Sequence, residues 1–508
     1  MKNETILQAF QWELPADHQH WQLLTKKAEE FNRLGITSLW LPPASKGSAG
    51  AEDVGYGTYD LYDLGEFDQK GSVPTKYGTK DDYLKMIDAL QQSGIKVYAD
   101  IVFNHFLGAD ETEEVSAVKY NWDDRNQQIG GEELIEAWTR FTFPGRKGVY
   151  NDYVWTWKNF SGVDYDARTK DHAVFNLGDK GWVEANEVDN ENGNFDYLMG
   201  CNLDMEYEET NLQLDNWGKW FMETTGIDGF RLDAVKHIQF DYFVDWLLRR
   251  REEKNGELFV VGEYWADEVD KLENYLDLSG NLINLFDVPL HFNFYRAASS
   301  MGAFDMRQIF DQTLLQSRPD YAVTFVDNHD TQKGQSLESW VEGWFKTHAY
   351  ALILLRKAGT PTVFWGDLYG IPSQDIDPVG RELLVLLLLR KNLAYGNEVD
   401  YFNDADQIGW VRTGDFDHED SGYAVVMTNA AGGELEMTIS AVHAGNTFVD
   451  ALGNNDAKII LDENGRGVFP VNDGQISVYV NEAIVSRIQD VDELLQIPSY
   501  DVTENENQ

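Results

Sequence analysis

The stretch GFRLDAV, residues 229–235, alternates between apolar and charged side chains over its central positions. In an extended strand, alternate residues point to the same side. One side carries the apolar groups, which suit packing against helices, and these are Phe230, Leu232 and Ala234. The other side carries Arg231 and Asp233, a guanidinium beside a carboxylate. The pattern predicts a buried strand with a charged pair near its carboxyl end.

Seven other short apolar runs recur along the chain, with helical patterns between them. Between the first two runs, apolar residues recur at helical spacing until Gly35 ends the pattern, namely Trp21, Leu24, Ala28, Phe31 and Leu34. Repeated β-then-α units predict a closed parallel (β/α)8 barrel, a TIM barrel. An open doubly wound sheet is the alternative, but no glycine-rich dinucleotide motif follows the first run. The eight predicted strands are residues 6–12, 38–41, 96–104, 229–235, 258–263, 282–288, 321–327 and 360–365.

Two segments depart from this alternation of strand and helix patterns. Residues 105–207 are rich in Asn, Asp, Gly and Trp, and they predict an irregular domain inserted after the third strand. Such βα loops lie at the carboxyl face of a barrel, where active sites form. From about residue 396, short strands between turn signals predict a C-terminal antiparallel β-sandwich, with strands at 408–412, 423–428, 435–439, 458–461 and 475–480. The expected boundaries are 1–104 and 208–396 for the barrel, 105–207 for the insertion, 397–485 for the sandwich and 486–508 for an acidic tail.

Composition excludes several classes of partner. The 508 residues include 87 Asp and Glu against 41 Lys and Arg, which leaves a formal net charge of −46. A nucleic-acid binder needs a basic surface, and an anionic membrane repels an acidic one, so we expect neither partner. Aromatic residues make up 13% of the chain, which suits stacking on sugar rings, although most of them are expected in the core. The single cysteine, Cys201, excludes intrachain disulfides.

The start of the chain, MKNETILQAFQW, enters strand-like sequence by Thr5 and shows no signal-peptide pattern. The longest apolar run, residues 383–389, is far shorter than the roughly 20 residues that span a bilayer. We therefore expect a cytoplasmic protein.

Chemically active residues gather at the predicted strand ends. Asp233 lies beside Arg231, whose charge is expected to lower the Asp233 pKa and keep the group ionised as a nucleophile requires. Glu263 precedes two large aromatic residues, which would raise its pKa as a general acid requires. Polar clusters also end the third and seventh strands, at Asn104-His105 after Asp100 and at Asp327-Asn328-His329-Asp330.

Each of these features has a structural alternative, namely an ion pair that closes a barrel layer, a solvated loop carboxylate or a buried structural histidine. Their coincidence at four strand ends favours chemistry. Two carboxylates across a cleft, with aromatic residues and no cofactor motif, are typical of glycoside hydrolysis.

Four segments together resemble the α-amylases of the large retaining α-glucan hydrolase family, glycoside hydrolase family 13. They are ADIVFNH at 99–105, GFRLDAVKH at 229–237, VGEYW at 261–265 and FVDNHD at 325–330, in the family's order and on predicted strands three, four, five and seven. Two further segments resemble the bacterial liquefying type and its unsecreted relatives, namely QAFQWELP at 8–15 and DVGYGTYDLYDLGEF at 53–67. The resemblance covers about residues 4–485.

The resemblance implies three catalytic carboxylates. Asp233 would be the nucleophile that forms a glycosyl-enzyme, and Glu263 the acid that protonates the leaving oxygen and then activates water. Asp330 would hold sugar hydroxyls and stabilise the distorted ring. The implied substrate is an α-1,4-glucan of the starch or glycogen type, cleaved internally with retention of configuration.

The resemblance also implies residues that bind the sugar. Arg231 would orient Asp233, His105 and His329 would hydrogen-bond the sugar, and Tyr56 would stack on it. Lys236 and His237 would lie on the leaving-group side. Further stacking surfaces could come from four tryptophans, of which only Trp265 is favoured over a core position; the others are Trp12, Trp155 and Trp157.

One structural calcium ion is implied where the inserted domain meets the barrel. The matching ligands are Asn104, Asp196, Asn202 and the backbone carbonyl of His237, and such oxygen ligands suit a hard cation. The family usually has Asp in place of Asn202, and Ala185 falls where relatives with extra metals carry an acid. These departures argue against a multi-metal cluster.

Two rival functions remain. A maltooligosaccharide-producing hydrolase, a transglycosylase or a branch-point enzyme could share this barrel, because fold alone does not decide the substrate. A non-catalytic glucan-binding protein is disfavoured, because all three carboxylates are present. The oligomeric state is left open by the sequence.

Overall fold

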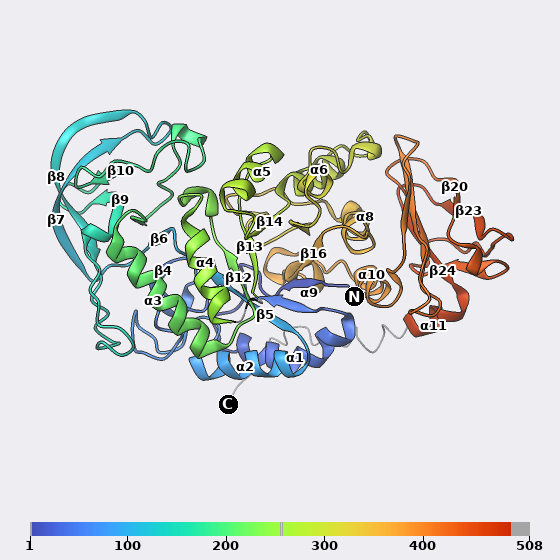
Figure 1. The fold of residues 1–508 in the computed structure, drawn as a ribbon, viewed down its shortest axis with the longest axis horizontal. Helices are drawn as coiled ribbons and strands as arrows, with labels where there is room; N and C mark the ends of the chain where they lie inside the picture. The colour runs from blue at the N-terminus through green and yellow to red at the C-terminus, as the bar shows by residue number, and fades with distance from the viewer. Residues whose placement is uncertain (1–2, 255, 257, 489–508) are drawn as a thin grey trace. The chain divides into compact units, whose positions relative to one another are not determined.

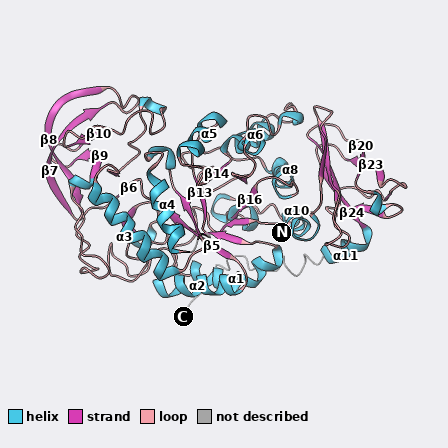
Figure 2. Cartoon of the chain, in the orientation of Figure 1, coloured by secondary structure: helices cyan, strands magenta, loops and turns pink. Residues whose placement is uncertain are grey.

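The computed structural model describes residues 3–254, 256 and 258–488 (Figures 1 and 2). Most of the predicted acidic tail, residues 489–508, lies outside the described residues. The chain forms two compact units. One contains the residues up to Glu13, Glu30–Thr37 and the chain from Asp287 onward, and the other contains Leu14–Glu29 and Ser38–Phe286.

Parallel strands form a closed barrel in the order β1-β16-β15-β14-β13-β12-β5-β2, which confirms the predicted fold class. Each of the eight predicted runs supplies one strand. They are β1 Ile6–Gln8, β2 Ser38–Trp40, β5 Lys96–Ile101, β12 Gly229–Leu232, β13 Phe259–Gly262, β14 Asn284–Phe286, β15 Ala322–Phe325 and β16 Thr360–Phe364.

All eight barrel strands end earlier than their apolar runs predict, and β12 shows one reason. It stops at Leu232, because Ala234 adopts a left-handed conformation with φ 48° and ψ 40°. The next residues, Val235–His237, form a 3-10 turn, η4. Asp233 therefore follows the last strand residue and lies at the carboxyl end of β12.

The helices alternate with the barrel strands as predicted. In α1 the five residues at helical spacing are all buried, and Gly35 follows with φ 87°. In α2, Thr79 and Asp82 form a capping box that satisfies backbone amides at the helix start. The helices are α1 His20–Leu34, α2 Lys80–Gln92, α3 Glu208–Thr225, α4 Tyr242–Glu253, α5 Val269–Leu278, α6 Val288–Ser299, α7 Leu314–Ser317, α8 Gly343–Leu354, α9 Trp365–Tyr369, α10 Arg381–Leu393 and α11 Val485–Ile488.

A small hairpin follows β2 and carries Tyr56 in its loop. Its strands are β3 Lys46–Gly47 and β4 Thr58–Asp60, with the 3-10 turn η1 Gly50–Glu52 between them. The ammonium group of Lys46 is fully buried and donates to the carbonyls of Phe67, Ser72 and Val73 at 2.6–3.1 Å. This buried group fixes the base of the hairpin to the segment that follows it.

The inserted segment is more regular than its composition predicts. It forms a six-stranded antiparallel sheet in the order β6-β11-β9-β10-β7-β8. In Figure 1, β7 and β8 form a long curved hairpin. The strands are β6 His105–Phe106, β7 Glu111–Tyr120, β8 Gln128–Arg140, β9 Phe160–Asp166, β10 Asp171–Leu177 and β11 Cys201–Leu203. Much of the hairpin is exposed and rich in charged residues, so its sequence lacks the apolar alternation that marks a strand.

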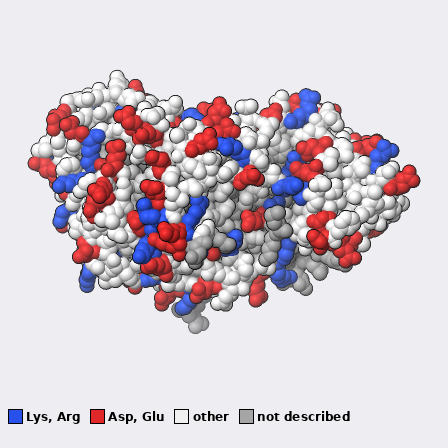
Figure 3. Space-filling view, in the orientation of Figure 1, with Lys and Arg blue, Asp and Glu red and all other residues white. Residues whose placement is uncertain are grey.

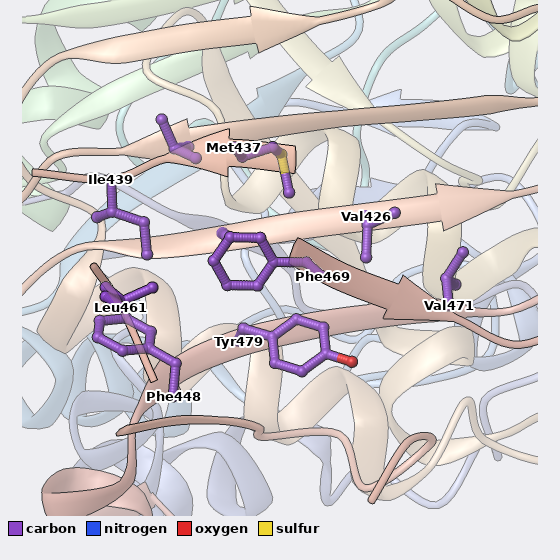
Figure 4. Close-up of a cluster of buried hydrophobic side chains, with 10 residues drawn as sticks. Val426, Met437, Ile439, Phe448, Leu461, Phe469, Val471 and Tyr479 are labelled. Atoms are coloured by element: carbon purple, nitrogen blue, oxygen red, sulfur yellow. The ribbon is translucent and has the colours of Figure 1, made fainter. Parts of the chain in front are cut away.

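The C-terminal part forms the predicted antiparallel β-structure. Its larger sheet has the order β17-β18-β19-β24-β21-β22, and β20 pairs with β23. A cluster of buried side chains from both sheets, including Met437, Phe448, Phe469 and Tyr479, makes its core (Figure 4). The strands are β17 Glu398–Tyr401, β18 Gln407–Arg412, β19 Tyr423–Thr428, β20 Gly433–Thr438, β21 Thr447–Asp450, β22 Ile459–Ile460, β23 Arg466–Val471 and β24 Ile476–Asn481.

Acidic side chains are spread over the visible face with basic ones between them (Figure 3). Among the described residues, no helix combines the length and the apolar composition that crossing a membrane requires. The apolar run at 383–389 lies in α10, where its side chains are buried in the protein.

Candidate active site

One buried guanidinium joins the carboxyl ends of adjacent barrel strands. The register of β12 sets Arg231 opposite Asp100 of β5 and opposite Val261 of β13. Arg231 donates from Nη1 to Asp100 at 2.8 Å and to Asp233 at 2.5 Å. It donates from Nη2 to Glu263 at 2.6 Å. Two carboxylates predicted from the strand ends thus contact the same side chain.

Asp100 is a site residue to which the sequence patterns assign no role. It is buried and accepts hydrogen bonds from Trp40 Nε1 at 2.9 Å and from the Tyr56 hydroxyl at 2.7 Å. The Arg231 guanidinium also lies 5.1 Å from the Trp40 ring centre and 5.7 Å from that of Tyr56. The sequence does contain one signal for this role of Asp100. It is a single carboxylate within an apolar strand, and a buried carboxylate needs a partner.

The backbone turn after β12 brings Asp233 and Glu263 to the same place. The amide of Asp233 donates to the carbonyl of Ile101 at 2.9 Å, and the amide of Glu263 donates to that of Leu232 at 2.9 Å. The amide of Ala234, the next residue, donates to the Glu263 carboxylate at 3.2 Å. Both carboxylates are buried and hydrogen-bonded, so their positions are fixed.

Burial dominates the acid–base properties of this pair. It raises the pKa of Asp233 to about 6, and the nearby charge of Asp100 adds to the rise, while Arg231 opposes it. The expectation that Arg231 sets a low pKa for Asp233 is therefore wrong in its net direction, because desolvation outweighs the guanidinium. Burial and the charge of Asp233 also raise the pKa of Glu263 against the influence of Arg231. A raised pKa is the property of a general acid.

His105 and Tyr56 lie together beside this group. The Nε2 atom of His105 lies 2.9 Å from the backbone carbonyl of Tyr56, and its Nδ1 atom lies 3.3 Å from Asn104 Oδ1. Burial lowers the pKa of His105, although the hydrogen bond to Tyr56 opposes this. A neutral imidazole is therefore favoured at this position.

Lys236 and His237 follow in the η4 turn. Lys236 Nζ donates to Glu191 at 2.7 Å and to the backbone carbonyl of Trp265 at 2.9 Å. His237 Nδ1 lies 2.8 Å from the carbonyl of Phe195, and burial lowers the His237 pKa to about 3. Trp265 is half-buried. These contacts tie the inserted segment to the residues that follow Asp233 and Glu263.

The unit that contains β15 holds the remaining predicted site residues. His329 Nδ1 lies 2.9 Å from Gln8 Nε2, and its Nε2 atom lies 3.2 Å from the carboxylate of Asp330. For Trp12 the sequence favours neither a sugar-stacking nor a core position. In the structure Trp12 is half-buried and stacks on His329 with 5.7 Å between ring centres. Asp330 keeps a side-chain exposure of 21%, so its carboxylate can reach a ligand.

Trp155 belongs to the core rather than to a binding surface. It is buried, and its ring lies 4.8 Å from that of Phe106 in an edge-on contact.

The proposed calcium ligands come from the residue before β6, from the inserted segment and from η4. Asn104 Nδ2 lies 3.5 Å from the carbonyl oxygen of His237, and Asn202 Nδ2 lies 3.3 Å from Asp196 Oδ1. Asn104, Asp196 and His237 line the same small cavity, of about 10 Å³. Among the described residues, no group of three or more His, Cys, Asp or Glu is placed to hold a metal ion. The predicted calcium site has only one carboxylate, and its other ligands are amide and carbonyl oxygens.

Two properties of these residues suit a cation. The Oδ1 atom of Asn202 is buried and has no hydrogen-bond partner. Burial raises the pKa of Asp196 to about 7, which means that its carboxylate has little compensation from its surroundings. Ala185, by contrast, is exposed and supplies no oxygen from its side chain. The residues therefore fit one hard cation.

Comparison with known proteins assigns the family. The family model for the α-amylase catalytic domain matches residues 15–409. An α-amylase of Geobacillus stearothermophilus is 49% identical over 94% of this chain and 87% of its own length. A glucan 1,4-α-maltohexaosidase of Bacillus sp. (strain 707) is 45% identical, with 94% and 93% covered. The cytoplasmic α-amylase of Escherichia coli (strain K12) is 43% identical, with 96% and 100% covered.

Solved structures agree in fold. An Anoxybacillus α-amylase superposes with a TM-score of 0.62 over 94% of this chain and 97% of its own, at 19% identity. The match of the family model to most of the chain, together with relatives of 43–49% identity over nearly its full length, leads to one conclusion. The chain belongs to the α-amylase family.

Proposed function

We propose that this protein hydrolyses internal α-1,4-glucosidic bonds of starch- and glycogen-type glucans and of maltooligosaccharides, with retention of configuration. The observation that carries the proposal is the contact of Arg231 with both Asp233 and Glu263. Two carboxylates close enough to share one guanidinium suit a retaining mechanism, in which the carboxyl groups are about 5–5.5 Å apart. The names of the related α-amylases support the choice of substrate.

Asp233 and Glu263 divide the chemistry. In the first step, Asp233 forms a bond to the anomeric carbon as the glycosidic bond breaks, and the leaving oxygen takes its electron pair and the proton of Glu263. In the second step, Glu263 accepts a proton from water, whose oxygen displaces Asp233 from the anomeric carbon. Each residue returns to its first protonation state, and the two displacements together retain the α-configuration.

The electrostatics of the pair match these roles. Glu263, with its raised pKa, holds the proton that the leaving oxygen needs. Asp233 must be ionised, which its pKa of about 6 permits near neutral pH. Arg231 acts on position as well as charge, because its planar fork fixes both carboxylates relative to each other.

The remaining predicted residues bind the substrate. Asp330 and His329 hold hydroxyl groups of the reacting sugar, His105 does the same, and Tyr56 stacks on the ring, while its hydroxyl is held by Asp100. Lys236, His237 and Trp265 contact the leaving part of the glucan. Aromatic faces and hydrogen-bonding side chains of this kind suit a sugar polymer.

A structural calcium ion suits the cavity beside η4. Oxygen atoms of Asn104, Asp196 and Asn202 and the carbonyl of His237 would hold it, and the buried, unpartnered Asn202 Oδ1 supports this set. When bound, the ion would supply a positive charge that compensates Asp196. The residues themselves link the inserted sheet to the turn after Asp233.

A maltooligosaccharide-producing hydrolase is the second candidate. The related maltohexaosidase, 45% identical, supports a defined product length as a variant of the same chemistry. We further propose that the protein acts in the cytoplasm on glycogen-like reserves, supported by its similarity to a cytoplasmic α-amylase over that protein's whole length. Fractionation of the native host tests the location, and activity found mainly in the medium of unlysed cells would contradict it.

The decisive experiment offers the protein soluble starch and dye-crosslinked amylose. Endo-cleavage releases dye early and gives a range of maltooligosaccharides, and NMR should show that their new reducing ends are first α-anomers. One dominant product from the start would favour the second candidate. Asp233→Asn serves as the control for contaminating activity. β-Anomers as first products, or no release of reducing sugar, would overturn the proposed function.

A further inference from the structure

A buried carboxylate of the inserted segment, Asp189, holds the residue that follows Glu263. Asp189 Oδ2 accepts a hydrogen bond from the Tyr264 hydroxyl at 2.6 Å. Tyr264 is itself buried, with its ring against Phe240 and Tyr275. The short bond therefore lies in a site that excludes water, where a hydrogen bond to a carboxylate is strong.

Asp189 joins several further elements. Its Oδ1 atom accepts from the backbone amide of Glu191 at 2.7 Å, and Lys271 of α5 approaches both carboxylate oxygens at 3.3 Å. Its backbone amide donates to the carbonyl of Lys236 at 3.0 Å. One residue thus ties the inserted segment to the turn after β12, to the loop after β13 and to α5.

The same segment supplies a second tie to the loop after β13. Lys236 Nζ bridges the Glu191 carboxylate and the carbonyl of Trp265. Tyr264 and Trp265, the two residues directly after Glu263, are therefore both held by contacts that lead to the segment around Asp189. Glu263 directly precedes these two residues in the chain. The direction of its side chain therefore depends on how Tyr264 and Trp265 are held.

The charge of Asp189 is retained in this network. Burial by itself would raise the pKa of Asp189, but hydrogen bonds from Tyr264 and from the Glu191 amide, with Lys271 and Lys236 nearby, outweigh burial and lower it. The group is therefore an anion that accepts from every neighbour, as a fixed anchor requires.

We infer that Asp189 is a positioning residue that aims the Glu263 carboxyl group at the leaving oxygen by holding Tyr264. The inference rests on the proposed role of Glu263 as the general acid. A misdirected acid transfers its proton poorly, and this matters in proportion to how much the leaving group needs the proton. Loss of the anchor should therefore harm poor leaving groups and spare good ones.

The test uses aryl α-maltotriosides with one glycone and leaving groups from dinitrophenyl, which needs little protonation, to unsubstituted phenyl, which needs much. For each, kcat/KM is measured from release of the phenol, which reports the first chemical step. Asp189→Asn keeps the shape but removes the charge that faces Lys271. Tyr264→Phe removes only the hydroxyl and keeps the buried ring. We expect both to lower kcat/KM about tenfold for the phenyl glycoside and less than about twofold for the dinitrophenyl glycoside.

Two controls separate the possible outcomes. Asp166→Asn changes another buried carboxylate of the inserted sheet, which accepts from the backbone amides of Glu136 and Arg168 and lies outside this network. It should show no dependence on the leaving group. Glu263→Gln should show the steepest dependence.

Equal loss across the series in Asp189→Asn and Tyr264→Phe, with a steep series in Glu263→Gln, would overturn the inference and leave the proposed acid intact. A flat series in Glu263→Gln would overturn the acid assignment, and the inference with it. A folded Tyr264→Phe variant keeps the test valid even if Asp189→Asn does not fold.

Discussion

The backbone amide of Ala234 donates a hydrogen bond to the Glu263 carboxylate at 3.2 Å. The donor belongs to the residue directly after the proposed nucleophile, and the acceptor is the proposed acid. Ala234 itself has a left-handed backbone, with φ 48° and ψ 40°, and it turns the chain from β12 into η4. Residues other than glycine rarely adopt that conformation, and strain of this kind collects at functional sites.

A β-branched residue at position 234 should break this arrangement. The left-handed conformation costs an L-residue about 1–2 kcal/mol, and a branched side chain adds to the strain. We expect Ala234→Val to lower the free energy of unfolding by at least about 1 kcal/mol and to reduce kcat. Urea titration and starch kinetics measure the two effects. Ala234→Gly is the matched control, because glycine accepts this conformation. Its free energy of unfolding should lie within about 1 kcal/mol of the wild-type value. Equal stability of the Val variant would argue against strain at this turn.

Replacing the proposed acid should nearly abolish turnover of polysaccharide. Glu263→Gln keeps the size and the hydrogen bonds of the side chain but cannot supply a proton. Loss of a positioned acid costs on the order of a hundredfold or more in rate. Glucan binding should survive, and it can be measured by calorimetric titration with a maltooligosaccharide.

Glu187→Gln is the control for this substitution. Glu187 also lies in the inserted segment and contacts Gln239, but it makes none of the contacts of the Arg231 group. It should retain most of the activity. If a clean preparation of Glu263→Gln kept most of its activity as well, another residue would have to be the acid.

The acidic limb of the pH profile should report Asp233. A nucleophile acts when ionised, so kcat/KM should fall about tenfold per unit as the pH drops below about 6, the pKa to which burial raises this group. The alkaline limb should report Glu263, which must be protonated and whose pKa burial also raises. Activity is therefore expected in the interval between the two.

Asp100→Asn should move the acidic limb. The negative charge of Asp100 raises the pKa of Asp233, and its removal also frees Arg231 to stabilise the Asp233 carboxylate. Both effects lower the pKa of the nucleophile, so the limb should shift to lower pH. A limb that stays in place or moves upward would contradict the arrangement of charges around Arg231.

The barrel was predictable because its strands are buried on both sides and stand out as apolar runs. The contacts that gather Asp233, Glu263 and Asp100 around Arg231 could not be predicted in this way. Arg231 is 32 positions from Glu263 and 131 positions from Asp100 in the sequence. The raised pKa of Asp233 depends on its burial, which no short motif encodes.

The strands of the inserted segment, by contrast, could not be predicted from composition. Its exposed strands β7 and β8 carry many charged residues, and their pairing rather than their composition makes them strands. The role of Asp189 was not predictable for a similar reason. In sequence it is one acidic residue among many, and its contacts distinguish it, above all the hydrogen bond from Tyr264, 75 positions away.

The proposed calcium site can be tested by changing the number of its charged ligands. Affinity for calcium rises with the count of anionic ligands and with the rigidity of the site. Of the proposed side-chain ligands only Asp196 is anionic, because Asn104 and Asn202 are neutral amides. Asn202→Asp would place a second carboxylate where the buried amide oxygen now lacks a partner. We expect it to bind calcium more tightly than wild type in calorimetric titration of metal-stripped protein.

The same ion should stabilise the fold, because a ligand that binds only the folded state adds stability as its free concentration exceeds its Kd. Chelation should therefore lower the Tm of wild type modestly and that of Asn202→Asp more strongly, while Asp233 and Glu263 keep their contacts with Arg231. Asn126→Asp adds the same charge at an exposed position of the inserted segment and should change neither affinity nor the response to chelation. Wild type that binds no calcium, or an Asn202→Asp variant that binds it no tighter, would show that Asn202 is not a ligand.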